Sequence, residues 1–251
     1  MTTTQDASSR SAQLEQFIDD VFSRGTVMGR SGETRDIFPT GLRRAAGERL
    51  YETVLQEGAT RTIETGFAFG LSGLFICKAL LAGGGEGARH VAADPWQEKG
   101  YDDAGLVTFE EAGLSSLLEF HRRQSGFLLP ELVEEGRTFD LAFVDGGHLF
   151  EVVFLDLYYL SRLVEPGGLI IVDDMWMPSV RLAVDFCVEN LRIVHENRVN
   201  PHHVMRRRIR SVLHLQRRHK PKEQEPVAYL RTPDKPMGRA WDHFQPFDHR
   251  Y

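Results

Sequence analysis

The sequence has few cysteines and no long apolar run, and each absence excludes a class of protein. Its 251 residues include only two cysteines, Cys77 and Cys187, which excludes a disulfide framework and a cysteine-rich zinc site. The longest apolar runs, such as Leu169–Val172, are far too short to cross a bilayer. The N-terminal stretch MTTTQDASSR lacks the apolar core of a signal peptide. We therefore expect a cytoplasmic protein with no membrane partner.

A large excess of positive charge is also absent. The formal net charge is −6, which disfavours nucleic acid as a general partner. The exception is Met205–Lys222, which holds eight arginines and lysines and no acid. This segment is typical of a solvated helix or loop, or of a contact with another subunit or an acidic substrate. A homo-oligomer is compatible with it, but no pattern demands one.

Strands and helices are predicted to alternate along most of the chain. Short apolar runs bounded by turn residues are typical of strands buried on both faces. We expect such strands at Arg61–Glu64, His90–Ala93, Phe139–Val144 and Leu169–Val172, a short third strand just before Gln124–Gly126, and two final strands at Ile193–His195 and Val227–Arg231.

Helical spacing of apolar residues fills the intervals between these strands. We expect helices at Leu42–Glu57, Gly73–Leu81, Leu114–Arg123, Glu151–Val164 and Val180–Leu191. Strands separated by helices predict an α/β fold: a doubly wound, mostly parallel sheet with helices on both faces.

The N-terminal segment, residues 1–40, precedes this alternation. We expect residues 1–11 to form a disordered leader and Ala12–Arg24 to form an amphipathic helix. Gly25–Gly41 is rich in Gly, Ser and Thr and predicts a loop able to close over a site as a lid. Residues 41–251 then form the main domain.

The first strand of the main domain runs into a turn of small residues, in the sequence ETGFAFGLS. Small residues let the backbone approach a ligand closely, and in doubly wound sheets this turn is the usual ligand crevice. The spacing is not G-x-G-x-x-G, which disfavours a NAD-dependent oxidoreductase. A carboxylate before the turn repels phosphate but attracts an ammonium group. The turn therefore favours a zwitterionic nucleoside, with S-adenosylmethionine (SAM) as the obvious candidate. The residues involved are Glu64, Gly66, Ala68, Gly70 and Ser72.

Asp94 follows the second strand of the predicted sheet. A carboxylate at this position can accept hydrogen bonds from both ribose hydroxyls, as it does in dinucleotide folds. The alternative is a turn-forming Asp-Pro pair. Together with the preceding turn, Asp94 favours a nucleoside site.

Acidic residues follow two further strands. Asp145 and His148 lie after Phe139–Val144, and Asp173 and Asp174 follow the next strand. Because parallel strands deliver their carboxyl ends to one edge of the sheet, these acids should converge. Carboxylates packed together repel one another unless a cation such as Mg²⁺ neutralises them. His148 is placed to act as a general base. The alternative is that the acids cap the helices that follow.

These motifs, taken in order, resemble a class I SAM-dependent methyltransferase. The matching pieces are ETGFAFGLSG, AADPW, FDLAFVDGGH and EVVFLDLYYLSRLVEPGGLIIVDD. The last two are similar to the small-molecule O-methyltransferase group that includes macrocin-type sugar O-methyltransferases and cephalosporin-hydroxylase-like proteins. The resemblance covers about residues 40–190 and implies a seven-stranded sheet whose last strand is antiparallel.

The resemblance also implies roles for residues around the cofactor. Glu64 and the Gly66–Gly70 turn would surround the methionine part of SAM, and Asp94 would bind the ribose. Gln124 or Ser125 would lie near the adenine.

For the metal-dependent members, the resemblance implies that Asp145, Asp173 and Asp174 bind Mg²⁺ and that His148 is the base. Asp145 would lie beside both the cofactor and the reacting hydroxyl. Two positions depart from the pattern of the group: Gly147 stands where Asp is common, and Asp173 stands where some members have Glu.

The sequence thus predicts a SAM-dependent O-methyltransferase that uses Mg²⁺. Its acceptor would be a hydroxyl of a small molecule: a sugar, a phenol or a natural-product intermediate. Two alternatives remain at this point: a non-methylating helper or scaffold protein on the same fold, and a nucleic-acid methyltransferase.

Overall fold

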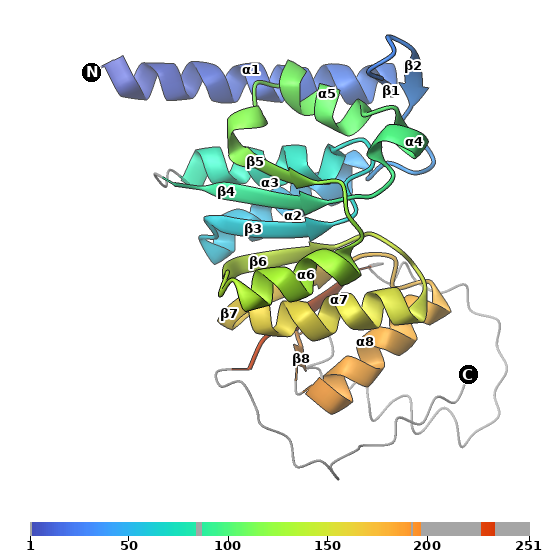
Figure 1. The fold of residues 1–251 in the computed structure, drawn as a ribbon. Coiled ribbons are helices and arrows are strands. Elements are labelled where there is room, and N and C mark those ends of the chain that lie inside the picture. Colours follow the sequence, from blue (N-terminus) through green and yellow to red (C-terminus); the bar gives the residue numbers. More distant parts are fainter. Residues whose placement is uncertain (1, 84–86, 192, 197–226, 234–251) are drawn as a thin grey trace, which may run out of the picture.

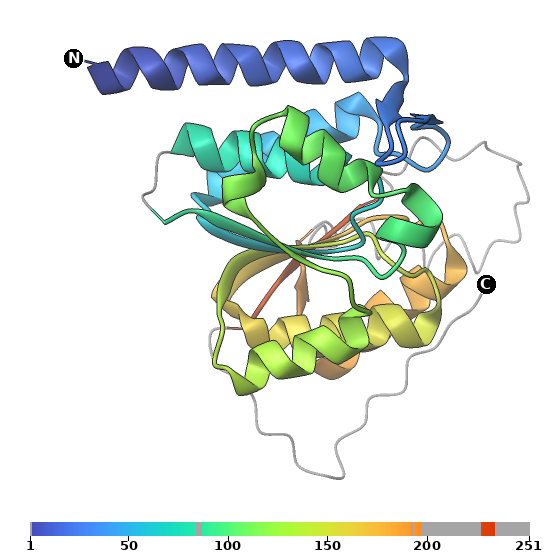
Figure 2. The same ribbon diagram turned by 45° about the horizontal axis from the view of Figure 1, so that its top comes forward.

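The computed structural model describes residues 2–83, 87–191, 193–196 and 227–233. A seven-stranded sheet lies between two layers of helices, and a separate two-stranded hairpin lies near one end (Figure 1). The view in Figure 2 shows the helices covering both faces of the sheet. The basic segment Met205–Lys222 lies outside the described residues, as does most of the chain after Thr232.

The seven strands are ordered β5-β4-β3-β6-β7-β9-β8. Strands β3 to β7 run parallel to one another, whereas β9 is antiparallel to both β7 and β8. This confirms the predicted mostly parallel sheet with an antiparallel last strand. The bounds are β3 Arg61–Thr65, β4 Arg89–Ala93, β5 Leu118–His121, β6 Phe139–Val144, β7 Val164–Val172, β8 Val194–His195 and β9 Ala228–Arg231.

Each face of the sheet buries its own apolar core. One core packs beneath α1 Thr2–Arg24, α2 Arg44–Glu57, α3 Leu71–Gly83, α4 Gln97–Tyr101 and α5 Ala104–Glu111. The other packs beneath α6 Ser125–Glu134, α7 Phe150–Leu163 and α8 Pro178–Leu191. The strands are buried on both faces, which is why their sequences lack alternation. Among the described residues, no helix combines the length and apolar character needed to span a membrane.

The N-terminal segment differs from the prediction in two ways. Helix α1 begins at Thr2, so the expectation of a disordered leader over residues 1–11 was wrong. No Gly or Pro precedes the amphipathic part, and helix propagation then costs little. The expected loop Gly25–Gly41 contains a hairpin of β1 Thr26–Met28 and β2 Thr34–Asp36.

The tip of this hairpin is docked onto the segment around α4 and α5. Arg30 forms a bidentate ion pair with Glu110, at 2.6 and 2.7 Å. The backbone N–H of Arg30 donates to the carbonyl of Asp102, and the Ser31 hydroxyl donates to the Asp102 carboxylate at 2.5 Å. The hairpin is therefore held against the region that follows β4. A closing motion of this segment stays a prediction.

The prediction of a helix at Leu114–Arg123 was wrong, whereas the short strand expected before Gln124 is confirmed as β5. A single 3-10 turn, Ser115–Leu117, is followed by β5, which pairs with β4 from His90↔Leu118 to Ala93↔His121. Backbone hydrogen bonding to the open edge of the sheet here overrides the local helical pattern. Helices α4, α5 and α6 were not predicted.

The chain order reverses at the centre of the sheet. Strand β3 pairs with β4 on one side and with β6 on the other, so the chain moves outward in opposite directions from this point. In doubly wound folds, ligands bind at the carboxyl edge of such a switch point. We therefore expect a ligand site at the loops that follow β3 and β6.

Asp156 is a buried acid on α7 beneath this edge. Its side chain is only 1% exposed, and the hydroxyl of Thr65, the last residue of β3, donates to it at 2.8 Å. Burial raises the pKa of Asp156 to about 6, and the hydrogen bonding of Ser125 and Thr65 opposes that shift only in part. Asp156 thus joins α7 to the end of β3.

We expect Gly47→Ala to destabilise the fold. Gly47 of α2 faces Phe75 of α3, and an added methyl carbon would lie 2.1 Å from the Phe75 ring. The overpacking should cost about 1–3 kcal/mol, more than the ~1 kcal/mol that alanine contributes in a helix. Urea unfolding measures the difference. The control is Gly126→Ala in α6, whose added carbon meets Leu155 at an ordinary 3.7 Å. Equal stability of the two variants would contradict this packing.

We expect Asp156→Asn to change how stability depends on pH. The pKa of Asp156 is higher in the folded chain, at about 6, than the ordinary 3.8, so folding favours the protonated acid. The wild type should therefore lose stability as pH rises from about 4 through about 6. The variant should not show this loss. Relative to the wild type, its free energy of unfolding should therefore rise by up to about 3 kcal/mol by pH 8.

The measurement is urea unfolding of both proteins at pH 5 and pH 8. Glu151→Gln, at an exposed position of the same helix, is the control and should show the wild-type pH dependence. A constant difference between Asp156→Asn and the wild type across this range would show that Asp156 is ionised throughout.

Candidate active site

The predicted Gly66–Gly70 turn lies directly against the loop that follows β6. Gly66 has a φ of +88°, and a methyl carbon added to it would lie 2.1 Å from the carbonyl oxygen of Asp145. Only glycine combines this backbone conformation with so close an approach. The turn and Asp145 are therefore parts of one site.

Asp94 fastens the turn from the side of β4. Its Oδ2 accepts hydrogen bonds from the backbone N–H groups of Phe67 and Ala68, at 3.1 and 2.8 Å. Its Oδ1 accepts from the backbone N–H of Trp96 at 2.7 Å. Ala68 has a φ of +43°, which is uncommon for a residue with a side chain. Asp94 thus holds the turn in an unusual conformation, and its predicted ribose contact stays a prediction.

Glu64 is fully enclosed beneath the turn. The Ser72 hydroxyl donates to its Oε2 at 2.6 Å, and His90 Nε2 lies 2.9 Å from its Oε1. The other ring nitrogen of His90 lies 2.9 Å from the hydroxyl of Thr62. This buried chain ties β3, β4 and the start of α3 together. The predicted contact of Glu64 with an ammonium group stays a prediction.

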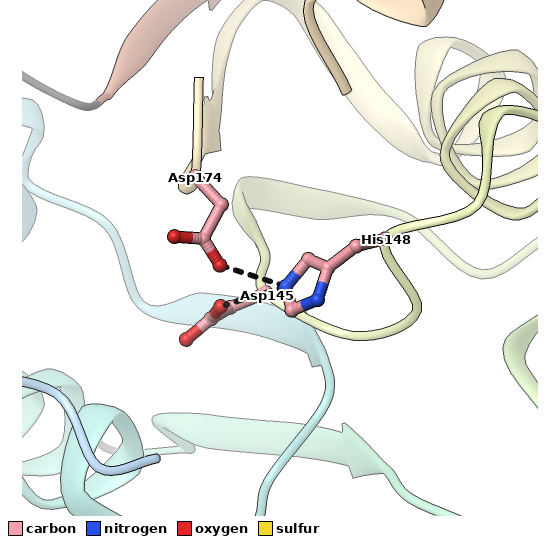
Figure 3. A group of neighbouring side chains, drawn as sticks. All are labelled: Asp145, His148 and Asp174. Carbon is pink, nitrogen blue, oxygen red and sulfur yellow. Dashed lines mark ion pairs between the residues drawn. The ribbon is translucent and has the colours of Figure 1, made fainter. Parts of the chain in front are cut away.

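Three of the predicted residues converge at the ends of β6 and β7 (Figure 3). His148 Nε2 lies 2.8 Å from Asp174 Oδ2 and 3.9 Å from Asp145 Oδ1. One ligand atom from each of these residues lies within 4.8 Å of the others, which is a spacing that a metal ion can bridge. All three side chains are partly exposed, whereas the Nε2 atom of His148, which faces the two acids, is buried.

The charges of this cluster shift one another's pKa values. Burial, followed by the charges of Asp173 and Asp174, raises the pKa of Asp145 to about 7. Asp145 and Asp174 raise the pKa of His148 to about 10. His148 in turn holds the pKa of Asp174 below its usual range. The cluster therefore carries more negative charge than His148 alone can balance.

Asp173 is close to the cluster but outside the compact group. Its backbone N–H donates to the carbonyl oxygen of Val144, which extends the hydrogen bonding between β6 and β7 by one residue. Its Oδ1 accepts from the backbone N–H of Asp174 at 2.8 Å. Burial is the main cause that raises its pKa. The side chain borders a pocket lined by α2, a position that the sequence did not reveal. Its role as a metal ligand stays a prediction.

Trp176 adds an interaction that the sequence analysis missed. Its indole N–H donates to Asp174 Oδ1 at 2.6 Å, while the residue as a whole is 64% exposed. The carboxylate of Asp174 lies between Trp176 and His148. The backbone of Asp174 has a φ of +55°, which is a strained conformation for a residue with a side chain. The flanking Met175 and Met177 instead pack against the core.

Gln124 and Ser125 lie at the start of α6, beyond the end of β5. Gln124 is exposed at the N-cap position, and Ser125 lies close enough to Asp156 to lower its pKa. Both residues lie at the carboxyl edge of the sheet, which is the position that the predicted contact with adenine requires. Their contact with adenine is a prediction that the geometry leaves open.

Two buried polar residues of the site region escaped the sequence analysis. His90 pairs with Glu64, and Asp156 interrupts the apolar run FEVVFLDLYYL of α7. An acid inside an apolar helical stripe is a signal that identifies Asp156 in retrospect. For His90 no such signal exists, because only the register of β3 and β4 brings it to Glu64.

Comparison with known proteins agrees with this geometry. Residues 63–175 match a family model described as a methyltransferase domain. They span the Gly66–Gly70 turn, Asp94 and the acid cluster. A search of curated protein sequences found no significant match.

Several solved structures share the fold at low sequence identity. An O-methyltransferase from Bacillus cereus in complex with SAH aligns with TM-score 0.58 and 17% identity, over 73% of this chain and 81% of that one. TomG from Streptomyces achromogenes, an O-methyltransferase involved in tomaymycin synthesis and solved with SAM, gives 0.54 and 20%, over 72% and 77%. SAH-bound PaMTH1 from Podospora anserina gives 0.60 and 15%, over 88% of both chains.

The strand order, the turn after β3 and the family match all point to the same conclusion. Residues 63–175 of this chain match a methyltransferase domain, and the chain shares its fold with the SAH-bound methyltransferases to which it aligns.

Proposed function

We propose that this protein transfers a methyl group from SAM to a hydroxyl of a small molecule. The observation that carries the proposal is the convergence of Asp145, His148 and Asp174 directly beside the Gly66 turn. A methyl donor in the turn and an acceptor at the cluster would be neighbours. Holding two reactants in this way supplies several kcal/mol of the rate enhancement.

The residues present fit SAM as the methyl donor. The Gly66–Gly70 turn lies at the switch point of the sheet, where nucleoside ligands bind in doubly wound folds. Asp94 would contact the ribose through Oδ1, since Oδ2 already accepts from Phe67, Ala68 and Gln97, and Gln124 or Ser125 would border the adenine. Glu64 would support the turn from below, since its carboxylate already binds Ser72 and His90.

The acid cluster fits a divalent cation such as Mg²⁺. Within the part of the chain that the structure describes, no lysine or arginine forms an ion pair with Asp145, Asp173 or Asp174. Carboxylate oxygens are the ligands that Mg²⁺ prefers, and these three residues would hold it. When bound, the cation would lower the pKa of an acceptor hydroxyl and balance the charge of the carboxylates.

His148 is the proposed general base. Its pKa of about 10 results from Asp145 and Asp174, so the ring keeps its proton at neutral pH while these carboxylates are unbalanced. Once their charge is balanced, the pKa of His148 should return toward the ordinary value of about 6.5, at which the ring accepts a proton. Trp176 would keep Asp174 in place throughout.

TomG, one of the structures that share this fold, is involved in tomaymycin synthesis. A biosynthetic small molecule is the acceptor class that we favour over a nucleic acid, because the chain carries a net charge of −6.

We expect His148→Ala to lose turnover and keep cofactor binding. The variant removes the proposed base without touching the Gly66–Gly70 turn, so turnover should fall about 10²–10⁴-fold. Calorimetry should give wild-type affinity for S-adenosylhomocysteine, and release of that product from SAM measures turnover on a panel of hydroxylated acceptors. Near-normal turnover of the variant would remove His148 from the mechanism.

We expect Asp174→Asn to weaken the response to Mg²⁺. The change removes one negative charge and one ligand oxygen from the cluster, so the heat of Mg²⁺ binding to chelator-treated protein should largely disappear. Glu189→Gln, at an exposed position near the end of α8, removes the same charge elsewhere and serves as the control. Identical Mg²⁺ titrations for both variants would exclude Asp174 from a metal site.

A further inference from the structure

Gln97, the first residue of α4, is a buried polar residue that the proposed mechanism does not use. Helix α4 follows β4 at the carboxyl edge of the sheet (Figure 1), and the Gln97 side chain is fully buried. Its Nε2 donates to the backbone carbonyl of Ala68 at 2.5 Å and to Asp94 Oδ2 at 3.3 Å. One amide group therefore joins the turn after β3 to the acid that follows β4.

Ala68 is held through both of its backbone groups. Its N–H donates to Asp94 Oδ2 at 2.8 Å, and its carbonyl accepts from Gln97. The same carbonyl is closely packed by α5, since a methyl carbon added to Gly105 would lie 2.6 Å from it. The φ of Ala68 is +43°, which a residue with a side chain seldom adopts. The turn therefore depends on these contacts to keep its shape.

The orientation of the Gln97 amide leaves one polar atom unpaired. Because both partners of the amide are oxygen acceptors, it has to present its NH₂ group to them. Its Oε1 is then buried, and no hydrogen-bond partner for it lies among the described residues. A buried oxygen without a partner lowers stability, and such local conflicts are typical of residues that serve function.

We propose that Gln97 is a positioning residue for the cofactor. It is fully enclosed, so it acts through Ala68 and Asp94, whose relative positions it fixes. By keeping Asp94 Oδ2 on the turn, it leaves Oδ1, which accepts one hydrogen bond from Trp96, to receive a ribose hydroxyl. This inference rests on the proposed binding of SAM at the Gly66–Gly70 turn and adds a residue on which that binding depends.

Two substitutions separate positioning from the filling of space. Gln97→Met keeps the length of the side chain but cannot donate, whereas Gln97→Glu keeps its shape and donates only when it is protonated. Burial beside Asp94 should raise the pKa of the introduced acid. If Gln97 only fills space, Gln97→Met should bind the cofactor as the wild type does. If its hydrogen bonds position the turn, Gln97→Met should bind weakly at every pH, and Gln97→Glu should regain affinity as the pH falls.

The test uses the full chain, with S-adenosylhomocysteine as the probe. Calorimetric titrations at pH 5 and pH 8 compare each variant with the wild type at the same pH, so the titration of other groups of the site largely cancels. Gln97→Met should bind on the order of tenfold more weakly at both pH values, which corresponds to the loss of one hydrogen bond. Gln97→Glu should show the same loss at pH 8 and approach the wild-type affinity at pH 5.

Gln16 provides the matched control, because its amide also donates to an aspartate, Asp20, but at an exposed position of α1. Gln16→Met and Gln16→Glu should bind as the wild type does at both pH values. Urea unfolding shows whether each variant is folded. Wild-type affinity of Gln97→Met, no recovery of Gln97→Glu at pH 5, or loss of folding in both Gln97 variants would each overturn the inference. Failure of the wild type to bind S-adenosylhomocysteine would instead contradict the proposed function itself.

Discussion

The close contact between Gly66 and the carbonyl oxygen of Asp145 is the constraint on which the site depends. It brings the turn after β3 against the loop after β6, at the point where the chain order of the sheet reverses. A side chain at position 66 would push these two loops apart. Because the turn is the proposed donor site and Asp145 begins the acid cluster, this contact sets the position of one reactant relative to the other.

The structure stabilises this arrangement from below with buried polar groups. Asp94 holds the backbone of the turn, Glu64 is enclosed by His90 and Ser72, and Asp156 binds Thr65. Buried polar groups of this kind are costly unless they are paired, and most of their hydrogen bonds link elements that are far apart in sequence. They fix the geometry of the carboxyl edge and leave the acid cluster above it partly exposed.

The acid cluster itself is electrostatically unbalanced. Burial and mutual repulsion raise the pKa of Asp145 and of Asp173, and His148 is the one cation close to them in the described chain that forms an ion pair with the cluster. An arrangement that costs stability in this way is typical of functional sites. It is consistent with the proposed cation site at the carboxyl edge of the sheet.

The sequence by itself determined the class of the fold and the residues that end each central strand. Apolar runs without alternation identify buried parallel strands, and acids or glycines directly after them must reach one edge, because parallel strands share a direction. Tertiary structure alone decided the bounds and register of the strand Leu118–His121, that His90 meets Glu64, and that Asp173 and Arg49 border one pocket. These depend on strand register and on helix packing between distant segments, and neither is encoded in a local pattern.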